Sequence, residues 1–283
     1  MFKPVFSMLS PAGARGRLSI LIFHRVLPAP DPLFPGEVTQ AQFDAICGWL
    51  REWFNVIPLA DAAVRLRERR LPSRAMSVTF DDGYADNHDL ALPVLRKHGL
   101  HATFFVASGF LDGGRMWNDT VIEALRRAPG PTLDLRGTAA GDMGLIPLDT
   151  LGERRAAVAQ LIGATKYRPL AERSAWVAAV AERAGVPLPN DLMMRSGQVR
   201  ALHAAGMTVG GHTVSHPILA RLETAEIHTE IAEGRRQLES IVASPVTVFA
   251  YPNGKPGDDY DERAVDVVRE KGFSAAVSTT WGT

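Results

Sequence analysis

The chain has 283 residues, 46% of them hydrophobic, with 31 basic and 31 acidic side chains. This length and apolar content suit one large α/β domain, or one domain with an insertion, around a sizeable core. The balanced charge gives no electrostatic reason to expect nucleic acid as a partner, and the single cysteine, Cys47, excludes an internal disulfide.

The amino-terminal segment contains short apolar pieces but no clear export signal. Pro4, Pro11 and Gly13 interrupt these pieces. The run Leu18–Phe23 is far too short to span a bilayer, and no small-residue cleavage pattern follows it. We therefore expect no transmembrane segment, and a location that is cytoplasmic or peripheral to the cell envelope. The sequence does not indicate an oligomeric state.

Apolar runs of strand length alternate with helical patterns along most of the sequence. The first strand is expected at Leu18–Phe23, and Thr39 with Gln42 predicts a capping box at the start of the helix that follows. Gly99 is expected to end a helix that begins near residue 86. The other expected strands are 54–57, 76–80, 102–107, 207–210, 246–250 and 274–278, and the other expected helices are 59–69, 223–242 and 261–271.

This alternation predicts an α/β fold with a parallel sheet and helical crossovers. Barrel enzymes carry their active loops at the carboxyl ends of the strands, so a closed or nearly closed β/α barrel would let distant polar groups meet. An open doubly wound sheet is the structural alternative.

The stretch from about 117 to 191 breaks the rhythm. It has helical patterns at 119–127, 151–162 and 171–184, a loop-rich piece at 129–147, and no convincing strand. We expect a single catalytic domain over residues 1–283 with a mainly helical insertion at about 117–191. A pair of extended crossovers is the alternative.

Two adjacent carboxylates, Asp81 and Asp82, follow an apolar strand. Successive strand residues face opposite ways, so the two side chains would normally diverge. Gly83 tolerates backbone angles that let the chain turn sharply, and both carboxylates can then converge. One could bind a cation while the other serves as a base. A solvated turn is an equal alternative for this segment taken alone.

Two imidazoles, His212 and His216, follow another expected strand. Pro217 disfavours helical geometry at His216, so the pair is expected in a loop or a single turn. Imidazoles at this spacing can chelate one ion, with Thr213 or Ser215 orienting them. Two histidines and one carboxylate leave positions on a divalent metal open for water and substrate. The combination points to metal-assisted hydrolysis.

A third segment leaves the strand at 246–250. Pro252 and Gly254 shape a tight loop whose backbone N–H groups, near Tyr251 or Asn253, could point at a developing oxyanion. Tyr251 could also line the pocket. An ordinary turn is the alternative.

Together these segments resemble the polysaccharide deacetylase family, carbohydrate esterase family four. The first family motif matches Thr79-Phe80-Asp81-Asp82-Gly83, and the second, His-Ser/Thr-x-x-His, matches residues 212–216. The resemblance covers about 18–278 apart from the insertion, and it implies a distorted or incomplete barrel. It also implies that Asp81 is the catalytic base and that Asp82, His212 and His216 hold the metal. Zinc is the first expectation, with cobalt, nickel, manganese and iron left open.

Two departures from the family pattern concern the base and the acid. The arginine that usually opens the third motif and orients the base is replaced by Ala250, as in many relatives that act on bacterial exopolysaccharide. The late Leu-x-His that supplies the general acid is absent before Thr283. In the exopolysaccharide (poly-N-acetylglucosamine deacetylase-like) subgroup a histidine at the end of the first strand takes the acid role, and His24 fits. A structural role for His24, or an acid beyond Thr283, is the alternative.

The resemblance implies a hydrolase that removes acetyl groups from an N-acetylated sugar or polysaccharide, so an acetylated carbohydrate is the expected partner. An O-acetyl esterase or another amide hydrolase would use the same residues. A non-catalytic glycan-binding or assembly protein of the same fold is the alternative from a different class.

Overall fold

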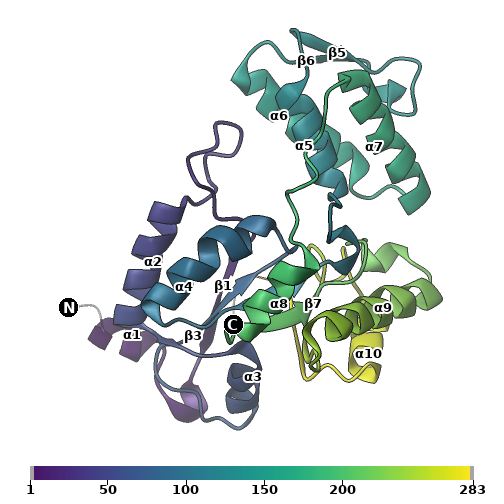
Figure 1. Ribbon diagram of the computed structural model, residues 1–283. Helices are drawn as coiled ribbons and strands as arrows, with labels where there is room; N and C mark the ends of the chain where they lie inside the picture. Colours follow the sequence, from purple (N-terminus) through teal and green to yellow (C-terminus); the bar gives the residue numbers. More distant parts are fainter. Residues whose placement is uncertain (1–2, 281–283) are drawn as a thin grey trace. The chain divides into compact units, whose positions relative to one another are not determined.

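The computed structural model describes residues 3–280 (Figure 1), and the chain divides into two compact units. Unit 1 contains the residues up to 30, residues 37–112 and the residues from 193 onward. Unit 2 contains residues 31–36 and 113–192. None of the helices among residues 3–280 is both long and apolar enough to cross a membrane.

A seven-stranded sheet forms the centre of unit 1, and every strand pair in it is parallel. Its strands are β1 (Leu18–Phe23), β2 (Asn55–Val56), β3 (Ala75–Phe80), β4 (Thr103–Val106), β7 (Thr208–Gly211), β8 (Val248–Ala250) and β9 (Ala275–Val277). Six of them run in the order β1-β3-β4-β7-β8-β9. The short strand β2 pairs with the beginning of β3, on the same side of β3 as β4. The sheet curls into a half-barrel, and within residues 3–280 no pairing of β1 with β9 closes it. The prediction of an incomplete β/α barrel is confirmed.

Helices cover this sheet. They are α1 (Lys3–Leu9), α2 (Gln40–Trp53), α3 (Leu59–Arg67), α4 (Leu92–His98), α8 (Ser196–Ala204), α9 (Thr224–Val242) and α10 (Glu262–Glu270). The capping box of Thr39 and Gln42 is present, and Gly99 ends α4 at φ +63°. A π-helical turn, Asn87–Ala91, precedes α4, where the sequence predicts one continuous helix. The sequence does not predict α1, because this helix buries no side chain and so shows no core-facing apolar stripe.

The core of unit 1 is built on β3, in which all six residues are buried. Phe80 stacks between Phe23 of β1 and Phe104 of β4, with ring centroids 5.3 and 4.8 Å away, and Phe43 of α2 meets Phe80 edge-on. Aromatic pairs of this kind contribute about 0.5–1.5 kcal/mol each beyond the area they bury. They fix the strands whose next residues form the site.

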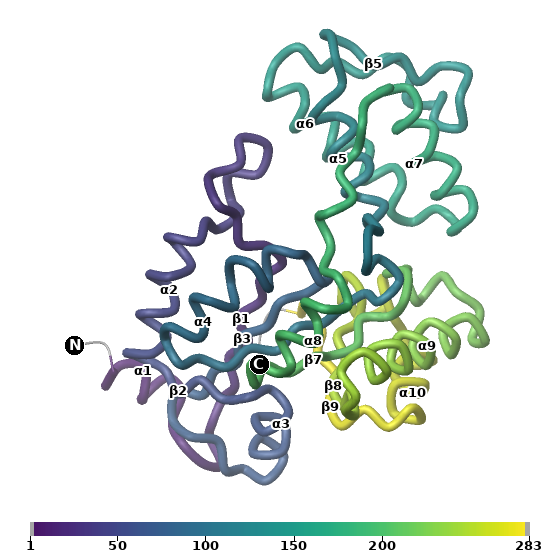
Figure 2. Tube along the Cα trace, in the orientation of Figure 1, coloured from purple at the N-terminus to yellow at the C-terminus, as the bar shows by residue number. Residues whose placement is uncertain are grey.

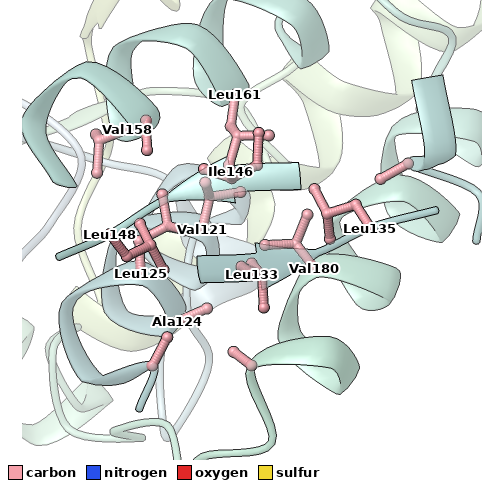
Figure 3. Close-up of a cluster of buried hydrophobic side chains, with 14 of the residues drawn as sticks. Val121, Ala124, Leu125, Leu133, Leu135, Ile146, Leu148, Val158, Leu161 and Val180 are labelled. Atoms are coloured by element: carbon pink, nitrogen blue, oxygen red, sulfur yellow. The ribbon is translucent and has the colours of Figure 1, made fainter. Parts of the chain in front are cut away.

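Unit 2 has its own apolar core between three helices and a small hairpin (Figure 3). Its elements are α5 (Trp117–Arg127), β5 (Thr132–Asp134), β6 (Leu145–Pro147), α6 (Leu151–Thr165) and α7 (Leu170–Ala184). The expectation of no strand in this stretch is wrong, because β5 and β6 pair antiparallel. Each strand has three residues and buries only its middle one, Leu133 or Ile146. An alternation this short does not stand out in the sequence.

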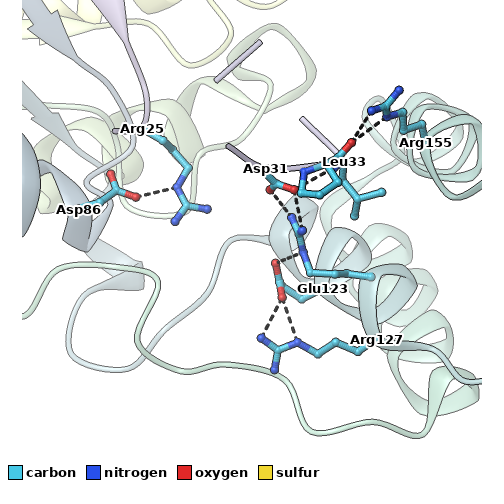
Figure 4. Close-up of polar contacts among 9 residues, drawn as sticks. Arg25, Asp31, Leu33, Asp86, Glu123, Arg127 and Arg155 are labelled. Carbon is cyan, nitrogen blue, oxygen red and sulfur yellow. Dashed lines mark hydrogen bonds and ion pairs between the residues drawn. The ribbon is translucent and has the colours of Figure 1, made fainter. Parts of the chain in front are cut away.

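Residues 31–36 also belong to unit 2, although they lie far from it in the sequence. Arg126 donates two hydrogen bonds to the Asp31 carboxylate, at 2.8 and 2.6 Å, and Arg155 donates to the carbonyl of Pro32 (Figure 4). The Arg126 hydrogen bond lowers the pKa of Asp31 against the opposing effect of burial. The second unit is therefore made from two separate stretches of chain.

Candidate metal and catalytic site

The strand register brings the predicted site segments to one edge of the sheet. Phe23 is paired with Phe80, Val106 with Gly211, and Gly211 with Phe249. Since parallel strands end at the same edge, the residues that follow β1, β3 and β7 emerge close together. These residues are His24, the pair Asp81 and Asp82, and His212.

The turn after β3 depends on Asp82 as well as on Gly83. Asp82 has φ +76° and Gly83 has φ +96°, so two successive residues occupy the left-handed region. A residue with a side chain in this region typically carries about 1–3 kcal/mol of strain, and strain of this kind collects at functional sites. Hydrogen bonds to the Asp82 and Gly83 carbonyls, from the N–H groups of Ala107 and Met194, hold the turn. From the sequence, only Gly83 is expected to make this turn.

The three predicted metal ligands form one cluster. Asp82 Oδ1 lies 3.4 Å from His212 Nε2 and 3.4 Å from His216 Nε2, and all three ligand atoms lie within 4.8 Å of one another. Two ligand atoms about 2.1 Å from a tetrahedral cation are roughly 3.4 Å apart. The donor set of two imidazoles and one carboxylate therefore fits a single divalent cation in both chemistry and spacing.

The His212 ring is oriented by the backbone of β8. Its Nδ1 lies 2.8 Å from the carbonyl oxygen of Ala250, and because a carbonyl only accepts, Nδ1 must carry the proton. The lone pair of Nε2 is then directed toward Asp82. A hydrogen bond of this kind from a ligand histidine fixes its tautomer and raises its basicity.

The electrostatics of the cluster favour a positive charge next to Asp82. Burial raises the pKa of Asp82, but the hydrogen bond to His212 and the charges of His216 and His212 outweigh it and hold that pKa below its usual range. Burial lowers the pKa of His212, yet the bond to Asp82 and the charges of both aspartates leave it raised. A cation bound here would meet a carboxylate that is already ionised.

Asp81 has a different environment although it is the next residue. Its side chain is buried, and Oδ1 has no hydrogen-bond partner among residues 3–280. Burial raises the pKa of Asp81; the charges of His212 and His24 lower it, and that of Asp82 raises it. A buried acceptor without a partner is costly unless a solvent or ligand proton meets it. This oxygen is therefore suited to take a proton.

His24 lies near Asp81, as the register requires, and its side chain is exposed. Its carbonyl accepts a hydrogen bond from Asn87 Nδ2 at 2.9 Å. The neighbouring Arg25 donates to Asp86 at 2.8 Å (Figure 4), and the other carboxylate oxygen of Asp86 accepts from the N–H of Val26. These contacts fix the backbone on both sides of His24.

The sequence profile of the polysaccharide deacetylase family matches residues 68–128 and 173–276, which together make up more than half of the chain. The chain belongs to the polysaccharide deacetylase family. This confirms the family that the sequence motifs indicated. The two matched segments contain the Asp81-Asp82 pair and both histidines, and the gap between them lies inside unit 2.

Individual relatives are distant in sequence, and two solved structures among them share the fold. The Bacillus subtilis (strain 168) protein YxkH, named for polysaccharide deacetylation, is 19% identical over 268 residues, which are 94% of this chain and 66% of that protein. The structure of deacetylase PplD from Streptococcus pyogenes, solved with acetate, has a TM-score of 0.61 at 17% identity and covers 94% of this chain and 84% of its own. The structure of IcaB from Ammonifex degensii has a TM-score of 0.58 at 20% identity, and the match covers 93% of this chain and 82% of the IcaB chain.

The third motif of this chain is arranged around a stack of aromatic rings. The Tyr251 ring is buried, lies parallel to that of Tyr260 with centroids 3.8 Å apart, and meets Phe249 edge-on. Burial raises the pKa of Tyr251 to about 12. Its backbone N–H donates to the carbonyl of Val277, so this N–H is occupied within the sheet. The N–H of Asn253, at φ +60°, has no partner among residues 3–280 and is the remaining candidate for an oxyanion donor.

One residue that the sequence analysis missed holds the loop between the two histidines. Glu230 of α9 accepts hydrogen bonds from the N–H groups of Val214 and Ser215, both at 2.9 Å, and from the Ser215 hydroxyl at 2.6 Å. The same helix approaches closely at Gly234, where a Cβ would lie 2.9 Å from the Thr213 carbonyl carbon. These contacts join positions that are 15 to 21 residues apart, and no local sequence pattern marks them.

Proposed function

We propose that this chain is a metal-dependent deacetylase that removes acetyl groups from an N-acetylated sugar or polysaccharide. Family membership supports deacetylase activity. The observation that carries the metal dependence is the cluster of Asp82, His212 and His216 ligand atoms beside the unpartnered oxygen of Asp81.

Zinc is the proposed cation, because two imidazoles and a carboxylate with open positions are typical of hydrolytic zinc sites. The same donors accept cobalt, nickel, manganese and iron, so the supply of each metal in the cell would also decide which one is bound. When bound, the cation would polarise the acetyl carbonyl and make water more acidic.

The proposed steps use three groups of the chain. Asp81 accepts a proton as a water oxygen bonds to the carbonyl carbon, and the N–H of Asn253 donates to the oxygen that gains negative charge. The carbon–nitrogen bond then breaks as His24 donates a proton to the nitrogen. Acetate and a free amine are the products.

The substrate class rests on the sequence motifs and on the relatives. PplD is described as a deacetylase and was solved with acetate, which supports acetyl as the group removed. The Phe249-Ala250-Tyr251-Pro252 segment resembles relatives that act on bacterial exopolysaccharide, and it supports an N-acetylglucosamine polymer as the first substrate to test.

The test is acetate release from protein stripped with a chelator and then resupplied with one metal at a time. The panel contains β-1,6- and β-1,4-linked N-acetylglucosamine oligomers, a peptidoglycan fragment and an O-acetylated glycan. We expect release from an N-acetylated glycan that is lost on stripping and restored by zinc. Release from the O-acetylated glycan alone would instead identify an esterase. Stoichiometric metal without release from any of them would identify a glycan-binding protein.

A further inference from the structure

Several large apolar side chains of unit 1 are exposed on the helices that lead into the amino ends of β1, β2 and β3. Within the described residues of unit 1, the large hydrophobic side chains that are exposed all belong to α1, the end of α2 or α3. They are Val5 (53% exposed), Met8 (82%), Leu9 (64%), Trp49 (51%), Val64 (41%) and Leu66 (47%). We call the surface formed by residues 3–17 and 49–74 the amino-end face, because these segments lead into the amino ends of β1, β2 and β3.

Contacts between these segments make the amino-end face a built surface. Helix α1 lies beside β2 (Figure 2). The Phe6 ring of α1 lies 6.2 Å from that of Trp53 and 5.1 Å from that of Phe54, and Trp53 stacks on Trp49 at 5.9 Å. The Arg74 guanidinium donates to the Ser7 hydroxyl at 2.8 Å. Helix α1 is therefore anchored by Phe6 and Ser7, while Met8 and Leu9 remain exposed.

The same face is strongly basic although the chain as a whole is neutral. Residues 1–17 and 49–74 contain nine basic and three acidic residues, whereas the whole chain has 31 of each. This part of the chain has a net charge of +6, and the remainder has a net charge of −6. Such an asymmetry attracts an anionic partner to one side of the molecule.

A cavity of about 720 Å³ lies at the edge of the amino-end face and is lined by basic groups. Arg51 of α2, Arg65 of α3 and Arg96 of α4 all line it. None of these three side chains has a hydrogen bond or ion pair with another described residue, whereas the neighbouring Lys97 is paired with Asp44 at 2.8 Å. Three unpaired guanidinium groups around a hollow suit phosphate oxygens.

We propose that the amino-end face docks on an anionic lipid membrane. Met8, Leu9 and Trp49 enter the boundary between headgroups and acyl chains, where tryptophan is favoured and an exposed apolar helix face is buried. The arginines of the cavity bind lipid phosphates, and the net positive charge draws the protein to the anionic leaflet. A second copy of the chain does not fit, since two faces of net charge +6 repel each other.

Docking in this way keeps the catalytic edge free. The candidate site follows the carboxyl ends of β1, β3 and β7, whereas the amino-end face leads into the amino ends of strands in the same sheet. The membrane would therefore meet unit 1 on the side away from Asp82 and its histidine partners. A glycan polymer at the membrane surface could then reach the site.

The test is sedimentation of the full chain with vesicles of phosphatidylcholine, with and without 30% phosphatidylglycerol. We expect binding to the anionic vesicles only, weakening as salt is raised. Arg51→Gln combined with Arg96→Gln should weaken it by roughly 25-fold, since each basic residue near an anionic leaflet contributes about fivefold. Adding Met8→Glu to this double variant should abolish most of the vesicle binding that remains. Leu145→Glu, at a leucine 52% exposed in unit 2, is the matched control and should bind as the unchanged chain does.

Several results would overturn the proposal. Absence of binding to anionic vesicles at low salt is one, and equal binding by Met8→Glu and Leu145→Glu is another. Full competition by millimolar glycerol phosphate would identify a free phosphate ligand rather than a membrane. A dimer in analytical ultracentrifugation that Met8→Glu dissolves would identify a second copy as the occupant. Circular dichroism and thermal unfolding of each variant establish that it is folded, and none of these readouts depends on deacetylation.

Discussion

The contact of Glu230 with the histidine loop leads to a sharp prediction about metal affinity. Glu230→Ala removes the acceptor of three hydrogen bonds at 2.9, 2.9 and 2.6 Å, all from Val214 and Ser215. A hydrogen bond to a charged group contributes about 1.5–3 kcal/mol, and the two N–H groups would be left without an acceptor. Because this loop positions His216 relative to His212, we expect zinc affinity to fall by about 10–100-fold, as is usual when support around a metal ligand is lost.

The assay is titration of metal-free protein with zinc against a competing chelator, together with the visible spectrum of the cobalt form. Glu230→Gln should recover most of the affinity. Its amide oxygen can accept from both N–H groups while its NH₂ donates to the Ser215 hydroxyl. Glu233→Ala is the matched control on the same helix, because Glu233 pairs with Arg236 and Gln237. The control should keep zinc affinity and the cobalt spectrum.

Two outcomes would refute this reasoning. Zinc affinity and a cobalt spectrum unchanged in Glu230→Ala would mean that other bonds suffice, such as those from the Ser108 and Gly109 N–H groups to the loop carbonyls. An equal loss in Glu230→Ala and Glu230→Gln, with the metal-free proteins destabilised alike, would show that Glu230 supports the fold in general rather than the loop.

Three further changes test other parts of the molecule. Asp81→Asn should fold and keep zinc but lose about 10²–10⁴-fold in turnover; full acetate release would remove Asp81 from the role of base. His24→Gln should reduce kcat while zinc affinity stays unchanged, and an unchanged kcat would place the acid elsewhere. Asp31→Asn should lower the free energy of unfolding by roughly 1–2 kcal/mol at neutral pH. The folded pKa of Asp31 lies below its ordinary value of 3.8. The difference in unfolding free energy between the two proteins, measured by urea titration, should therefore shrink as pH falls below about 4. A difference that persists at low pH would exclude the Asp31–Arg126 ion pair as its cause.

The strands and the clustering of Asp82 with His212 and His216 could be predicted because each rests on a local pattern. Apolar runs that end in Asp81-Asp82-Gly83 or in His212 are visible in the sequence, and parallel strands must end at a common edge. The left-handed backbone at Asp82 could not be predicted, since aspartate alone does not require it. Its cause is tertiary, because the Ala107 and Met194 N–H groups bind the carbonyls of the turn.

The features that escaped prediction depend on pairings between distant segments. Asp31 joins unit 2 through Arg126, 95 positions away, and Glu230 reaches a loop 15 positions away. Neither pairing changes the periodicity of its own segment. Helix α1 escaped prediction for a different, local reason. It is short and buries none of its residues, so its sequence has no core-facing apolar stripe.

Ala250, at the position where the family usually has an arginine, shows how this chain meets the requirements of the site differently. The carbonyl of Ala250 accepts a hydrogen bond from the Nδ1–H of His212, and Ala250 belongs to a buried apolar cluster with Leu59, Phe105 and Val248. A guanidinium placed there would lose its hydration inside that cluster, and an unpaired buried charge typically costs several kcal/mol. Without a guanidinium neighbour to lower it, the pKa of Asp81 remains raised by burial. The alanine therefore orients the His212 ring through its backbone and leaves the buried Asp81 carboxylate without an arginine neighbour at this position.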